Sequence, residues 1–166
     1  MTTPRRGLPP NGPGFVTLWL AGAPLWGAAM ALSALTGLYL RLRLETGHLP
    51  MVLALFFAGG LLGWAVALPL LRSLIRRWST ERRFAAVLLV LTCATIFATA
   101  GLFALQYRIF YAQWHAAFGS RIWVYQFVFT AAGAVYQFLV MGLRLYLPVG
   151  LVLLMAASLF LARRMR

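Results

Sequence analysis

The chain has very few ionisable side chains apart from arginine. It contains no lysine and no aspartate, its two acids are Glu45 and Glu81, and its one cysteine is Cys93. A single cysteine excludes an intrachain disulfide, and the apolar run around it indicates a small buried hydrophobe. The sequence also lacks paired intramembrane acids, a Ser/His/acid set and a glycine loop for phosphate. It therefore predicts no enzyme, no metal site and no resident cofactor.

Apolar residues, in contrast, are abundant. Hydrophobic residues make up 63% of the chain and charged residues 10%, whereas soluble domains are nearer half apolar and a quarter charged. A water-soluble fold of this size could not bury so much apolar surface. The composition therefore predicts an integral membrane protein with the lipid bilayer as its surroundings.

The apolar residues are grouped into runs of membrane-spanning length. The hydrocarbon core is about 30 Å thick, so a helical span needs about 20 residues. The runs are continuous rather than alternating, which favours an all-α bundle over a β-barrel. We expect four transmembrane helices, with five possible, at Phe15–Leu40, Pro50–Leu71, Phe84–Tyr107 and within Ile122–Ala162. They form one domain of residues 15–162, between a cytoplasmic tail of residues 1–14 and a basic tail of residues 163–166.

The last third of the chain is too long for one span. Residues 122–162 form an apolar stretch of 41 residues interrupted only by Arg144, and as one helix they would reach roughly 60 Å. The stretch must therefore divide. Two spans joined by a turn around Arg144–Pro148 would give five in total. An aromatic-rich segment that lies partly in the interface before Arg144 would give four.

The distribution of arginines favours four spans with both termini in the cytoplasm. In that arrangement four arginines are outside, Arg144 is unassigned, and ten are inside: Arg5, Arg6, Arg72, Arg76, Arg77, Arg82, Arg83, Arg163, Arg164 and Arg166. Five spans would give eight inside and seven outside, which removes the positive-inside bias. We therefore predict a multi-pass protein of a bacterial inner membrane.

Two segments are expected at the membrane surfaces. The formal charge of +13 is interpreted as topology signals and contacts to anionic lipid headgroups, not as nucleic-acid binding. The headgroup contacts are assigned to the inner loop, at Arg72, Arg76, Arg77, Arg82 and Arg83. On the outer face, Arg108–Arg121 is rich in aromatic side chains, which favour the headgroup level. We expect this segment to form an interfacial element.

A few polar residues stand out within or beside the later spans. Arg144 either marks a helix boundary and reaches toward the headgroups, or lies buried and needs a partner such as Gln126 or Gln137. The two glutamines are eleven residues apart and share a helix face, which favours interhelical bonding or a polar path. Gly59 and Gly63 in the second span form a Gly-x-x-x-Gly pattern typical of close helix packing.

Three classes of function remain open. We favour an accessory or packing subunit that acts through helix–helix contacts, as a homo-oligomer or with a larger membrane protein. The four-span plan, with Tyr146-Leu-Pro-Val-Gly150 opening the last span, resembles the small membrane subunit of tripartite periplasmic transporters. The acid that we would expect early in that family's second span is missing here. A haem-binding membrane protein is the third class, with His48 and His115 as weak candidate ligands.

Overall fold

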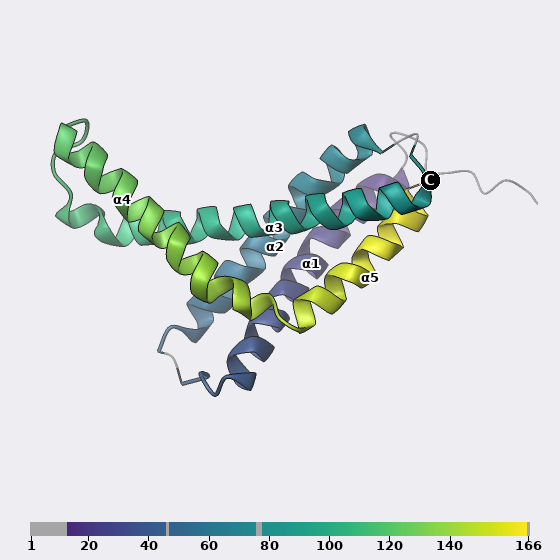
Figure 1. Ribbon diagram of the computed structural model, residues 1–166, viewed down its shortest axis with the longest axis horizontal. Helices are drawn as coiled ribbons and strands as arrows, with labels where there is room; N and C mark the ends of the chain where they lie inside the picture. The colour runs from purple at the N-terminus through teal and green to yellow at the C-terminus, as the bar shows by residue number, and fades with distance from the viewer. Residues whose placement is uncertain (1–12, 46, 76–77, 166) are drawn as a thin grey trace, which may run out of the picture.

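The computed structural model describes residues 13–45, 47–75 and 78–165, and every regular element in these ranges is helical (Figure 1). The helices are α1 (Pro13–Leu40), α2 (Leu49–Leu74), α3 (Thr80–Tyr111), α4 (Arg121–Gln137) and α5 (Val149–Arg164). A short 3-10 segment, η1 (Ala112–Trp114), follows α3. The predicted all-α fold is confirmed.

Four helical segments are long and apolar enough to cross a membrane. They are Gly14–Leu40, Leu49–Leu74, Thr80–Trp114 and Arg121–Tyr146. The first three contain the predicted spans, and all but the first residue of the fourth lies in the predicted stretch 122–162. Helix α5 has 16 residues, which corresponds to about 24 Å. The expectation of four transmembrane helices, with a fifth possible, is therefore confirmed.

The helix starts carry local signals that the sequence already contains. Pro50 lies in the first turn of α2, where its missing N–H would have no intrahelical partner. The Ser79 side chain accepts a hydrogen bond from the Arg82 amide at 3.5 Å and caps α3. In the same way, Ser120 accepts from the Trp123 amide at 3.1 Å and caps α4. These caps satisfy amides that a helix start leaves unpaired.

The apolar stretch of residues 122–162 divides where the sequence predicts. After α4 the helix first widens, in the π-helical segment η2 (Phe138–Gly142), and then tightens, in the 3-10 segment η3 (Leu143–Tyr146). Leu147 is extended, and α5 begins at Val149. Proline disfavours helical geometry in the residue before it and lacks an amide donor. Pro148 therefore ends the helical path at this point.

Helices α1, α2 and α5 run side by side, and α3 crosses them at a tilt (Figure 1). The start of α1, the end of α2, the start of α3 and the end of α5 meet at one end, which we call the arginine-rich end. There, Leu18 of α1 lines the same groove as Arg164 of α5. At the opposite end, the Arg41 guanidinium donates to the Arg144 carbonyl at 3.0 Å. The junction between α4 and α5 therefore lies near the end of α1.

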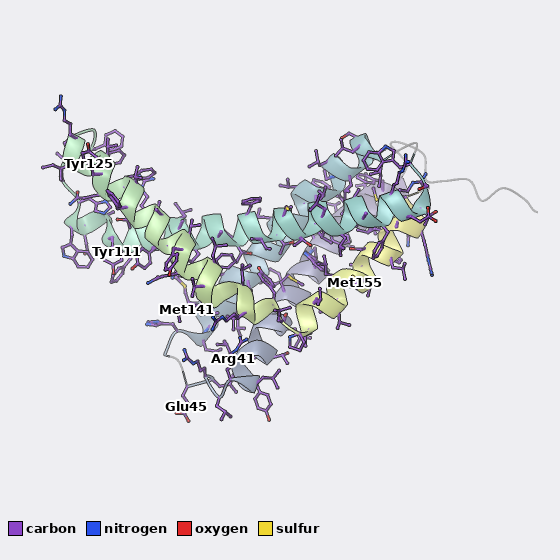
Figure 2. All side chains as sticks on the ribbon, in the orientation of Figure 1. Arg41, Glu45, Tyr111, Tyr125, Met141 and Met155 are labelled. Carbon is purple, nitrogen blue, oxygen red and sulfur yellow. The ribbon has the colours of Figure 1, made fainter. Side chains whose placement is uncertain are left out.

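The last part of α3 and α4 form a hairpin, the α3–α4 arm, that extends away from the other helices (Figure 1). Figure 2 places Tyr111 and Tyr125 on this arm, far from Arg41 and Glu45 at the end of α1. Only 11% of the apolar window in the fourth span is buried, compared with 28–39% in the other three spans. The fourth span, which contains α4, is therefore the least covered of the four.

The buried core consists of two apolar clusters. The larger one lies toward the arginine-rich end and joins α1, α2, α3 and α5, with Trp26, Met30, Trp64, Leu68, Leu71, Ile75, Val87, Leu91 and Leu161 among its members. The smaller one consists of Ala34, Phe56, Ala100 and Phe138. Phe138 begins the π-helical segment, so the smaller cluster fixes the start of the helix break against α1, α2 and α3.

Candidate functional site

Glycines allow α2 to approach α3 closely. A Cβ on Gly63 would lie 2.6 Å from the Thr95 Cα, and a Cβ on Gly59 would collide with the Thr99 side chain. Gly60, between them in sequence, lies against Gly27 and Met30 of α1. The two positions of the predicted Gly-x-x-x-Gly pattern are therefore helix contacts. Because glycine has no side chain, the backbones of the two helices can approach each other closely there.

A set of polar contacts links the helices across this close packing. The Trp26 indole N–H donates to the Thr95 hydroxyl at 3.0 Å. The Ser33 hydroxyl donates to the Leu145 carbonyl at 3.1 Å, which connects α1 to η3. Each contact satisfies a polar group that would otherwise be unpaired in apolar surroundings. These residues could not be predicted from the sequence, because a lone Ser, Thr or Trp in a span carries no pattern.

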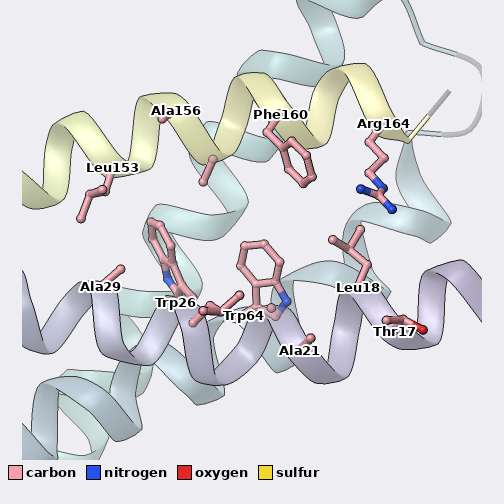
Figure 3. A pocket seen from close by; sticks show the side chains of 13 residues that line it. Thr17, Leu18, Ala21, Trp26, Ala29, Trp64, Leu153, Ala156, Phe160 and Arg164 are labelled. Carbon is pink, nitrogen blue, oxygen red and sulfur yellow. The ribbon is translucent and has the colours of Figure 1, made fainter.

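A groove of about 550 Å³ lies between α1 and α5 (Figure 3). Its walls are mostly apolar, with Leu18, Leu25, Leu153 and Phe160 among the lining residues, and Arg164 lies at the arginine-rich end. This volume falls within the range of about 300–1,000 Å³ that is typical of small-molecule sites. The groove thus combines apolar walls with a cation at one end.

The Trp64 indole enters this groove although Trp64 belongs to α2. It is 5% exposed, and its Nε1 has no hydrogen-bond partner among the described residues. A Cβ on Gly22 would overlap the indole and would lie 2.6 Å from Nε1. Because Gly22 has no side chain, the ring passes α1 and reaches the groove, where it lies near Trp26 with ring centroids 6.1 Å apart. The described residues therefore leave this buried N–H without an acceptor.

The α3–α4 arm holds the aromatic cluster that the sequence predicts. The Arg108 guanidinium lies over the Phe127 ring at 4.5 Å and near the Trp123 ring at 5.8 Å. The Gln126 side chain accepts from the Ala116 amide at 2.8 Å. These contacts tie the connection between α3 and α4 to α4 itself. The arm is thus built as a unit through cation–π and hydrogen-bonding contacts.

Arg144 lies in η3 and its side chain is exposed. Each candidate partner is engaged elsewhere: Gln126 with Ala116, and Gln137 with the Tyr107 hydroxyl of α3. The structure therefore places Arg144 at a helix boundary and does not bring these three predicted residues together.

The two histidines occupy different connections of the chain. His48 directly precedes α2, whereas His115 lies between α3 and α4 and its Nε2 is 3.3 Å from the Thr130 hydroxyl. Figure 1 shows the two connections at separate corners of the molecule. No group of three or more potential metal ligands occurs within the described ranges. The structure does not bring the two imidazoles to one site.

The inner-loop arginines lie at the arginine-rich end where the structure describes them. The Arg72 guanidinium lies 4.0 Å from the centre of the Phe15 ring of α1, and Arg82 and Arg83 follow in the first turn of α3. Arg76 and Arg77, which the sequence also assigns to headgroup contacts, lie outside the described residues.

Comparison with protein-family models, with curated proteins and with solved structures gave no match. The resemblance to a transporter subunit therefore stays a prediction.

Proposed function

We propose that this chain is an accessory subunit of a bacterial inner membrane that acts through helix–helix contacts with a larger membrane protein. The observation that carries this proposal is the outward face of α4. Ala134 is the one buried residue of α4, while Tyr125, Phe129 and Tyr136 point outward and Phe129 is 73% exposed. A helix in the headgroup layer needs a polar face toward water. After Arg121, α4 offers no charged residue on any face.

Helix α4 therefore needs apolar surroundings on the side that α3 does not cover. Charge favours a different protein over a second copy as the source of those surroundings. Each copy carries a formal charge of +13 with only two acids, so two copies repel each other, whereas a partner with acidic surfaces is attracted. In this proposal the arm makes the apolar contact with the partner protein. The arginine-rich end attracts a partner with acidic surfaces and disfavours a second copy of the chain.

The same geometry supports a membrane orientation. With the arginine-rich end in the cytoplasm, α1, α2, α3 and α5 cross the bilayer in turn. In this orientation the shorter α5 is the fourth span, and α4, although the segment Arg121–Tyr146 is long and apolar enough to cross, begins and ends toward the outer side. Both termini are then cytoplasmic, in line with the positive-inside bias. Because α5 is short, the bilayer thins locally around it. The long side chains of Arg163 and Arg164 also reach the headgroups.

Site-specific photocrosslinking tests the proposal. A photoreactive amino acid is placed at Phe129 on the arm and, as a matched control, at Val152, which is 66% exposed on α5. In cells that express the full chain, we expect a crosslink from residue 129 to one larger membrane protein and none from residue 152. A crosslink between two copies of the chain would favour a homo-oligomer instead, and lipid adducts alone from both sites would contradict the proposal. If the partner is a permease, the chain is a transporter subunit.

A further inference from the structure

We propose that the α3–α4 arm is a hinged element that swings relative to the bundle, which consists of α1, α2, α5, η3 and the first part of α3. The chain enters the arm through the middle of α3 and leaves it through η2 (Figure 1). Gly101 is the pivot in the first connection, and Phe138–Gly142 is the pivot in the second. The inference concerns the chain alone and does not depend on the proposed partner.

Gly101 lies inside α3, close to the point where this helix leaves α2. The neighbouring Ala100 packs in the smaller core cluster with Phe56 of α2, whereas Arg108, two turns later, contacts α4. A Cβ on Gly101 would meet nothing within 4 Å, so close packing does not require a glycine here. Glycine makes a helix easier to bend and less stable than alanine does. At this position it therefore supplies backbone freedom.

The turn of α3 before Gly101 has a second feature of a helix that bends. The Thr99 hydroxyl donates to the Thr95 carbonyl, four residues earlier, at 2.8 Å. Hydrogen bonds of this kind often bend helices, because the carbonyl is shared with the backbone amide. In a membrane, threonine hydroxyls also satisfy backbone groups that a bend releases. The first connection can therefore bend without leaving polar groups unpaired in lipid.

The second connection has an irregular backbone. The Leu143 amide donates to the Phe138 carbonyl, five residues earlier, and the Leu147 amide donates to the Arg144 carbonyl, three residues earlier. Such π-helical and 3-10 segments within a helical path often mark kinks and hinges. The three residues in the middle of η2 are exposed and belong to neither core cluster: Leu139, Val140 and Met141.

The Phe138 ring forms a joint about which the arm can turn. It is buried, and its centroid lies 6.3 Å from that of Phe56 and 6.4 Å from that of Phe103. A Cβ on Gly142 would lie 2.5 Å from the ring, so glycine leaves the space that the ring occupies. These contacts are apolar and non-directional. The ring can therefore rotate in place without breaking a hydrogen bond.

Both sides of the hinge are held together as units. On the bundle side, the Arg41 guanidinium and the Ser33 hydroxyl of α1 donate to carbonyls of η3 at 3.0 and 3.1 Å. On the arm, the Gln126 side chain ties α4 to the amide of Ala116 in the connection that follows α3. Motion between the two units is therefore concentrated at Gly101 and η2.

Distances between pairs of spin labels test the hinge in the full chain in lipid nanodiscs. In a Cys93→Ala background, labels are attached at Tyr39→Cys on α1 and Phe118→Cys on the arm, where the native residues are 62% and 85% exposed. We expect two populations of distances for this pair. The control pair joins Tyr39→Cys to Leu89→Cys, which lies on α3 before the hinge, and should give one narrow distance. A single narrow distance between residues 39 and 118 would overturn the proposal.

Two alanine variants separate the hinge from general helix stability. Gly101→Ala and Gly133→Ala each add a methyl group inside a helix where nothing lies within 4 Å, so both variants should fold. Gly101→Ala should lower the less populated distance between residues 39 and 118 about fivefold, because alanine favours the continuous helix. Gly133→Ala, within the arm, should leave the populations unchanged. Equal effects of the two variants, or no effect of Gly101→Ala, would contradict a pivot at Gly101.

Hydrogen exchange tests whether the two pivots move together. Gly101→Ala should slow exchange about fivefold at residues 101–105 and also at residues 138–142, because bending of one connection requires bending of the other. A purely local gain in helix propensity would slow exchange at residues 101–105 alone, and that result would overturn the proposal. Gly133→Ala should leave exchange at residues 101–105 unchanged.

Discussion

The hydroxyls of Thr99 and Tyr146 lie 2.7 Å apart and join α3 to the segment where the last third of the chain bends. Thr99 also lies 2.8 Å from the Thr95 carbonyl, to which it donates. Because a hydroxyl has one proton, Tyr146 must be the donor to Thr99. The Tyr146 ring lies near Phe56 of α2, with ring centroids 4.9 Å apart. One side chain thus holds the helix break against two helices.

Removal of the Tyr146–Thr99 hydrogen bond should modestly lower the free energy of unfolding. The effects of substituting the two residues should be coupled. We expect Tyr146→Phe and Thr99→Val each to lower the free energy of unfolding by about 1 kcal/mol, with a coupling of about 0.6 kcal/mol, as is typical of interhelical bonds in membranes. Unfolding of single and double variants in mixed micelles measures both quantities. Thr36→Val, whose hydroxyl bonds within its own helix, is the control. Strictly additive losses would show that the two hydroxyls act independently.

The contact between α2 and α3 should not tolerate a methyl group at Gly63. Gly63→Ala places a Cβ against the Thr95 backbone, and we expect a loss of about 2 kcal/mol from this overpacking. Gly133→Ala is the matched control, because a Cβ there meets nothing within 4 Å. Alanine has the better helix propensity, so this control should be neutral or slightly stabilising. A stable Gly63→Ala variant would contradict the described packing.

The Gln126 side chain should hold the tip of the arm. Gln126→Ala leaves the Ala116 amide without its acceptor, so residues 112–120 should open more often. A loss of about 1 kcal/mol corresponds to roughly fivefold faster hydrogen exchange in this segment. Gln113→Ala is the control, because Gln113 is exposed and its side chain donates to the Phe110 carbonyl three residues earlier. Unchanged exchange in both variants would show that the arm connection is held by its aromatic contacts instead.

The proposed orientation predicts opposite labelling of two positions. Cys93 is the only native cysteine, so a Cys93→Ala background permits single-cysteine tests. In intact spheroplasts, an impermeant maleimide should label Phe118→Cys, at a residue that is 85% exposed on the arm. It should label Arg163→Cys only after the membrane is opened. Labelling of residue 163 in intact spheroplasts would place the C-terminus outside and require five crossings.

The helix lengths and the helix break could be predicted because they depend on local sequence. Continuous apolar runs identify the spans, and Pro148 acts on its immediate neighbours. The packing role of Gly59 and Gly63 was also within reach, since their spacing places both on one helix face.

The direction of the helices and the groove could not be predicted in the same way. The apolar composition of α4 is that of a span, and only contacts such as that between Arg41 and Arg144 show that it ends near the end of α1. The approach of Trp64 to Gly22 joins two residues that are far apart in sequence and share no pattern. Such pairings depend on how side-chain volumes fit across helices, which a single sequence does not encode locally.

Gly22 makes the depth of the groove adjustable at a single position. A side chain added there would overlap the Trp64 indole, so the ring or α1 must shift. A series of substitutions at residue 22, from Gly to Ala, Ser and Val, would therefore test how much added volume this contact tolerates. Gly22 and Trp64 both line the groove, so the series would change the groove through a single contact between α1 and α2.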